Sequence, residues 1–69
     1  MLKIYPNNVK EYRNLIGQLH REDGAAIEWP NGDKYWFIKG LYHRIAGPAF
    51  EHGDIKRWYL NGRLYIETI

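Results

Sequence analysis

The stretch that decides the fold is Leu19–Gly40, which reads LHREDGAAIEWPNGDKYWFIKG, because most of it returns further along the chain. His20–Ala26 aligns with His43–Ala49 at a step of 23 residues, and Trp36–Gly40 aligns with Trp58–Gly62 at a step of 22. A fixed period of this size is typical of a repeat protein, and it outranks local propensity in deciding the architecture. The chain therefore reads as tandem copies of one short unit.

Residues 1–69 form a single repeat domain in this interpretation. Its parts are a degenerate copy at 1–18, a copy at 19–41, a copy at 42–62 and a C-terminal strand at 63–69. In the first copy Tyr5–Asn7 matches Trp29–Asn31, and Lys10–Tyr12 matches Lys34–Trp36. Atypical terminal copies are what a stacked array needs as caps.

Each copy predicts β-structure. Asn31-Gly32 and Asn61-Gly62 predict two-residue type I′ turns, which need positive φ at both central residues. Lys39-Gly40 stands at the equivalent position of its copy, although lysine tolerates positive φ less well than asparagine. The turn at His52–Asp54 is one residue shorter. We expect an all-β fold, an antiparallel meander of tandem 22–23-residue hairpin repeats.

One segment also fits a helix. Residues 8–17 begin with Asn8 at an N-cap position, carry Glu11 three residues later and end with Gly17 at a C′ position. Helices this short need tertiary support, whereas the repeat alignment favours a strand. A short N-terminal helix over residues 8–16 stays open as the alternative.

Period-2 alternation assigns faces within the strands. Trp36 and Ile38 share one face, and Tyr35 and Phe37 take the other. Trp36 is expected to stack near Trp58 of the next copy. Neither face is cleanly polar, which indicates that something covers the second one.

Composition limits the function classes. The chain has three Trp, six Tyr and two Phe, and its net charge of +2 comes from ten basic and eight acidic residues of mixed order. It has no Cys, no Ser and one Thr, so nucleophilic catalysis is not expected. The three His lack ligand spacing, so we expect no metal site and no cofactor. Without an apolar run long enough for a signal or a membrane span, we expect a cytoplasmic protein with no membrane partner.

His20-Arg21 and His43-Arg44 recur at one repeat position. One hypothesis is that these residues act as general bases or phosphate clamps. The alternative is that they are structural and form hydrogen bonds with the loop at the end of each hairpin, because a position fixed by the repeat is more often structural. Glu28 and Glu51 are also repeat-equivalent, and we expect them across from basic residues such as Lys34 and Arg57.

Interleaved aromatic and basic residues suggest a binding surface. The candidate residues, expected on one face, are Tyr35, Phe37, Arg57, Tyr59, Lys39 and Arg44. Aromatic platforms with cations bind single-stranded nucleic acid, and Tyr, Trp and Arg are enriched in protein interfaces. The competing interpretation is that these rings fill a β core. Residues 64–69 predict an edge strand that pairs with another chain, which favours a homodimer.

The repeat resembles a family of small bacteriophage and giant-virus proteins with tandem LHREDGPA, NG and WYxNG motifs, similar to MORN-type β-hairpin repeats. The resemblance is strong over 19–62, with Ala25 in place of the usual Pro and Ile45-Ala46 in place of the second Glu-Asp. It implies a β-meander and no particular activity. A phage origin favours a non-enzymatic protein in the host cytoplasm that contacts and inhibits a host defence or metabolic protein. The alternatives are a nucleic-acid-binding module and a structural or assembly module.

Overall fold

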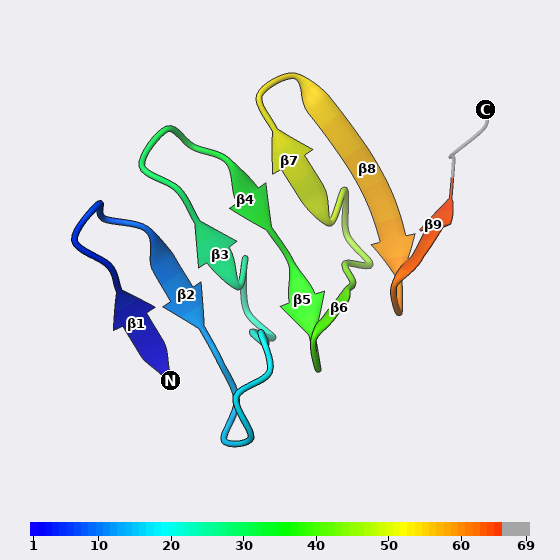
Figure 1. Cartoon of the computed structure of the whole chain (residues 1–69). Coiled ribbons are helices and arrows are strands. Elements are labelled where there is room, and N and C mark those ends of the chain that lie inside the picture. The colour runs from blue at the N-terminus through cyan, green and yellow to red at the C-terminus, as the bar shows by residue number, and fades with distance from the viewer. Residues whose placement is uncertain (66–69) are drawn as a thin grey trace.

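Antiparallel strands make up the molecule, and the computed structural model describes residues 1–65 (Figure 1). One seven-stranded sheet has the order β1-β2-β3-β4-β7-β8-β9, and a two-stranded ladder joins β5 to β6. The strands are β1 (Leu2–Ile4), β2 (Lys10–Tyr12), β3 (Ile27–Glu28), β4 (Lys34–Tyr35), β5 (Phe37–Ile38), β6 (Leu41–Tyr42), β7 (Phe50–His52), β8 (Ile55–Leu60) and β9 (Arg63–Tyr65). The predicted all-β meander is confirmed.

The helix alternative for residues 8–16 is wrong. Strand β2 pairs with β1 on one side and with β3 on the other, so its backbone groups are used in the sheet. A turn follows, in which Gly17 has φ 87° and its N–H donates to the Asn14 carbonyl at 3.0 Å. Pairing on both sides supplies hydrogen bonds that an isolated two-turn helix could not match.

Two of the predicted turns have the expected type. Lys39 and Gly40 have φ values of 51° and 80°, and Asn61 and Gly62 have 49° and 81°. Positive φ at both central residues is the mark of the type I′ turn. Lysine therefore adopts a left-handed conformation at Lys39, a position where Asn is tolerated more easily.

The prediction for Asn31-Gly32 is wrong, because only Gly32 has positive φ, at 97°. The loop is longer: the Gly32 N–H donates to the Trp29 carbonyl at 3.0 Å, and the Trp29 N–H donates to the Asp33 carbonyl at 3.0 Å. Pro30 favours this arrangement, because its fixed φ suits the first central position of a type I turn. The first copy has the same loop, with Asn8 at φ 67° in place of glycine.

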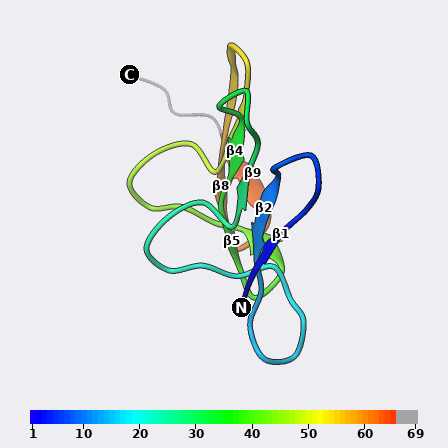
Figure 2. The ribbon, with the colours of Figure 1, turned by 90° about the vertical axis from the view of Figure 1, so that its left-hand side faces the viewer.

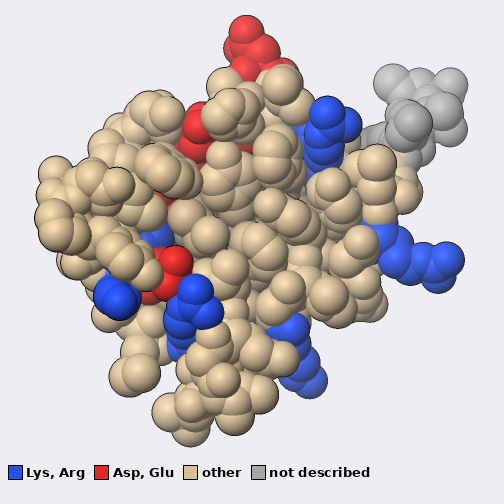
Figure 3. All heavy atoms as spheres, viewed as in Figure 1, with Lys and Arg blue, Asp and Glu red and all other residues tan. Residues whose placement is uncertain are grey.

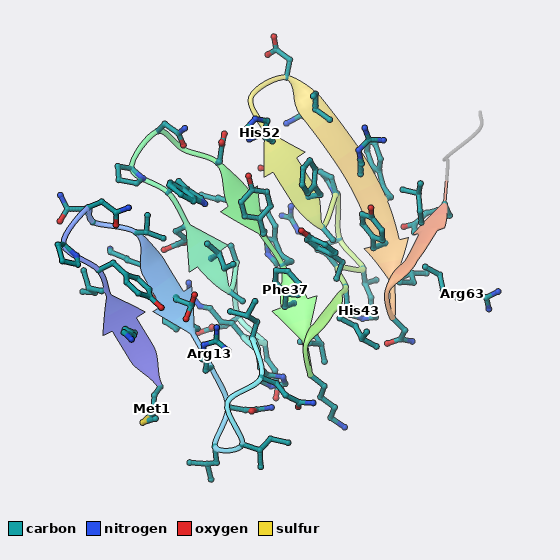
Figure 4. All side chains as sticks on the ribbon, viewed as in Figure 1. Met1, Arg13, Phe37, His43, His52 and Arg63 are labelled. Carbon is teal, nitrogen blue, oxygen red and sulfur yellow. The ribbon has the colours of Figure 1, made fainter. Side chains whose placement is uncertain are left out.

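Register defines the two faces, because residues directly opposite on neighbouring strands point to the same side. One row consists of Glu11, Ile27, Tyr35, Phe50 and Arg57. We call its side the front face; it is turned toward the viewer in Figure 4, which draws the side chains. The row on the opposite side, the back face, alternates in charge through Lys10, Glu28, Lys34, Glu51 and Lys56.

The predicted partners of the two glutamates are partly right. Glu28 lies opposite Lys34, as expected. Glu51 lies opposite Lys34 and Lys56, whereas Arg57 lies opposite Phe50 on the front face. The carboxylates of Glu28 and Glu51 form their ion pairs with Arg21 and Arg44, at 3.4 and 3.3 Å.

The sheet is a single layer, and the molecule has principal extents of 40 × 27 × 15 Å. Two long loops, residues 19–26 and 43–49, project from the back face, on the left in Figure 2. The buried hydrophobic residues of the described part are Val9, Ala25, Ala26, Phe37 and Ala49. Phe37 is the one aromatic residue among them, so most of the aromatic surface stays partly open to solvent.

Each projecting loop is held by an arginine that reaches back to the sheet. The Arg21 guanidinium lies 4.0 Å from the centroid of the Tyr12 ring, and the Arg44 guanidinium lies 3.8 Å from that of Trp36. The expected stacking of Trp36 on Trp58 is wrong: no such ring pair occurs within residues 1–65, and Arg44 covers the Trp36 ring instead.

Candidate functional site

A cluster of aromatic rings occupies the front face. We call it the front cluster; it consists of Tyr35, Phe37, Tyr42, Phe50 and Tyr59. Tyr42 lies at its centre, stacked on Phe37 at a centroid distance of 4.2 Å and on Tyr59 at 4.8 Å. Phe50 meets the edge of Tyr42 at 6.0 Å and the Tyr35 ring at 5.1 Å. Figure 4 shows the rings gathered between the labelled Phe37 and His52.

Strand pairing brings these rings together. Tyr35 lies opposite Phe50 across β4 and β7, and Phe37 lies opposite Tyr42 across the Lys39-Gly40 turn. Residues two apart in a strand share a side, so Tyr59 joins the row that contains Arg57. The register of these strand pairs therefore brings the rings of the front cluster together.

The front cluster is partly exposed. Phe37 is 8% exposed, and the other four rings are of intermediate burial. Beside them Ile55 and Leu64 are 48% and 52% exposed. In Figure 3 this face is a broad uncharged area, with both basic and acidic residues at its border. Partial burial raises the pKa of the Tyr42 and Tyr35 phenols above the usual value of 10.0.

The structure separates the six predicted binding residues. Tyr35, Phe37 and Tyr59 belong to the front cluster, and Arg57 is exposed on the same face. Lys39 is exposed at a turn. Placing Arg44 on this face was wrong: it lies over Trp36 and pairs at 3.3 Å with Glu51, a back-face residue.

Sequence reasoning missed Tyr42 and Phe50. Both could have been found: a two-residue turn at Lys39-Gly40 puts Phe37 opposite Tyr42. Phe50 stands one repeat step after Ile27, and both occupy the front-face row.

An acidic brace lies at the upper end of the front face, next to the cluster. Asp33 is 8% exposed, and its carboxylate accepts the Gly53 N–H at 2.9 Å. His52 Nδ1 lies 2.8 Å from the same carboxylate and 3.2 Å from the Tyr35 hydroxyl. The Gly53 hydrogen bond is the main reason that the pKa of Asp33 lies below its usual 3.8. This brace joins the turn of one copy to the turn of the next.

Within residues 1–65, no group of three His, Cys, Asp or Glu side chains is arranged to hold a metal ion. The same part of the chain has no helix with the length and apolarity required to span a membrane. Comparisons of the chain with protein-family models, curated proteins and solved structures found no match.

Proposed function

We propose that this protein is a non-enzymatic binding module whose front face docks on a partner protein. The observation that carries the proposal is the front cluster, a set of aromatic rings that lies on an open sheet face. Aromatic residues bury on the order of 150–250 Å² each, and Tyr and Arg are enriched among the residues that dominate interface energy. A single-layer sheet gains a second layer when a partner covers this face.

The partner that we propose is a host protein of the defence or metabolic class, which the protein inhibits by occupying its surface. The resemblance to phage repeat proteins supports this part of the proposal. The exposed Arg57 beside the aromatic rings matches an apolar partner patch that carries an acidic residue at its margin.

Strand β8 offers a matched pair of variants for the test. Arg57 and Lys56 are neighbours and both exposed, but Arg57 faces front and Lys56 faces back. A protein captured from host-cell lysate is purified and titrated against the wild type, Arg57→Glu and Lys56→Glu. We expect at least tenfold weaker binding for Arg57→Glu and little change for Lys56→Glu. Equal losses would refute the assignment of the front face.

Salt dependence separates a protein partner from nucleic acid. Binding that rests on phosphate contacts weakens steeply as salt rises, whereas an interface dominated by aromatic burial changes little. A steep dependence would favour the nucleic-acid alternative. Capture of this chain alone would favour self-association through the same face, as in a homodimer or an assembly module.

A further inference from the structure

A groove lies on the back face, between the two projecting loops. This loop groove has a volume of about 660 Å³, within the range of small-ligand pockets. Trp36 and Ile38 supply apolar lining from the sheet, and Ile45 supplies it from the second loop. Arg44 and His43 also line the second-loop side, and Glu22 and Asp23 line the side of the first loop.

The two arginines of the repeat make the same contacts except for one. Arg21 Nη1 donates to the Ala25 carbonyl at 3.1 Å, and Arg44 Nη1 donates to the Pro48 carbonyl at 3.1 Å. Each Nη1 also reaches a back-face glutamate, at 3.4 Å in the first copy and 3.3 Å in the second. Arg21 Nε donates in addition to Asp23 at 2.9 Å.

The second copy lacks the matching acid. One repeat step after Asp23 stands Ala46. Within residues 1–65 no side chain accepts a hydrogen bond from Arg44 Nε. Arg44 lines the groove, and its guanidinium keeps a donor edge free of the acid that Asp23 supplies to Arg21.

The histidines differ in the same way. His20 Nδ1 accepts the Lys39 N–H at 2.9 Å, and His43 Nδ1 accepts the Asn61 N–H at 3.0 Å. In a neutral ring the proton then resides on Nε2, which is a donor. His20 Nε2 lies 3.2 Å from Glu22. The corresponding residue beside His43 is Ile45, and within residues 1–65 His43 Nε2 has no carboxylate partner.

We propose that the loop groove binds an acidic side chain of a protein segment, whose carboxylate takes the position on Arg44 that Asp23 holds on Arg21. In the first copy, Asp23 therefore occupies the position that the ligand carboxylate takes in the second copy. The Nε edge of arginine matches a carboxylate, and His43 Nε2 supplies a further donor. The apolar lining of the groove suits the methylene groups of a glutamate.

Charge favours a carboxylate over a phosphate. Glu22 and Asp23 stand on the facing loop, with side chains 82% and 86% exposed, and Glu51 already pairs with Arg44. A dianionic group would share the groove with these carboxylates and be repelled by them more strongly than a singly charged group, which would repeat the arrangement of the first copy. The inference is independent of the proposed function, because the groove lies on the opposite face.

The test restores the missing acids. The double variant Ile45→Glu/Ala46→Asp gives the second loop the residues of the first, an arrangement that this chain already folds. The probes are the blocked peptides acetyl-Ala-Glu-Ala-amide and acetyl-Ala-Gln-Ala-amide, followed by NMR of the arginine Nε–H signals. We expect the glutamate peptide to shift the Arg44 signal in the wild type, and at least tenfold weaker binding to the double variant. The glutamine peptide should bind at least tenfold more weakly than the glutamate peptide.

A reciprocal variant extends the test. Glu22→Ile/Asp23→Ala removes the internal acids from the first copy, so the glutamate peptide should then shift the Arg21 Nε–H signal as well. Equal binding of the two peptides, or unchanged binding to Ile45→Glu/Ala46→Asp, would overturn the proposal. Tighter binding of inorganic phosphate than of the glutamate peptide would overturn the carboxylate assignment.

Discussion

Replacing Tyr42 by leucine tests whether the front cluster holds the sheet together. Leucine keeps an apolar side chain and removes the ring, which stacks on Phe37 and Tyr59 at 4.2 and 4.8 Å. Aromatic pairs are worth roughly 0.5–1.5 kcal/mol each beyond the area they bury, so two stacked pairs predict a loss of about 1–3 kcal/mol. Domains have about 0.05–0.15 kcal/mol of stability per residue, which for this chain is of order 3–10 kcal/mol.

The free energy of unfolding is measured by urea titration with circular dichroism, on the wild type, Tyr42→Leu and Tyr65→Leu. Tyr65 is the control because it lies opposite Trp58 on the back face and makes no ring pair within residues 1–65. A loss below about 0.5 kcal/mol for Tyr42→Leu, or a loss no greater than that of the control, would show that the rings do not stabilise the sheet through mutual contact.

Three further predictions concern the turns and the titratable groups. Lys39→Asn should stabilise the protein by roughly 0.5–1 kcal/mol in urea unfolding, because asparagine tolerates the left-handed conformation better than lysine; no gain would contradict this reason. Asp33→Asn should lower the melting temperature at neutral pH. Since folding lowers the pKa of Asp33, its contribution is fully present above pH 3.8 and is lost as the pH falls through the folded value, so the two proteins should converge in acid. Burial raises the pKa of Tyr42, so its contribution is present below pH 10.0 and is lost as the pH rises through the folded value; the stability of Tyr42→Phe should therefore fall less in alkali than that of the wild type.

The repeat predicted the sheet well because turn chemistry and strand register are linked. A type I′ turn at Lys39-Gly40 leaves one choice of partners for the flanking residues, and the structure has that pairing. The turn at Asn31-Gly32 failed because the dipeptide alone does not fix the loop length. Pro30, one residue earlier, favours a type I turn, in which the following glycine takes the left-handed position.

Alternation failed where the chain leaves the sheet. Arg44 lies in the second projecting loop, and its side chain returns to the back face, so counting alternate residues along the preceding strand does not predict which face it occupies. A signal for this packing was present in the sequence as Gly24 and Gly47, which follow the two arginines by three residues. A Cβ at Gly24 would lie 2.9 Å from the Arg21 guanidinium carbon, and one at Gly47 would lie 3.2 Å from that of Arg44. At both positions glycine leaves room for the arginine side chain, which folds across the loop.

Each loop arginine stacks on an aromatic ring of the preceding copy. Each unit is therefore held in place partly by a residue of the unit before it. The Tyr12 ring contacts the Arg21 guanidinium, and the Trp36 ring contacts that of Arg44. Trp58 is the equivalent residue of the next copy, on β8. A gene segment duplicated in frame after this strand would therefore encode a unit whose docking platform already exists. Array length can change by whole units without any new kind of contact, which makes this architecture easy to lengthen by recombination or by design.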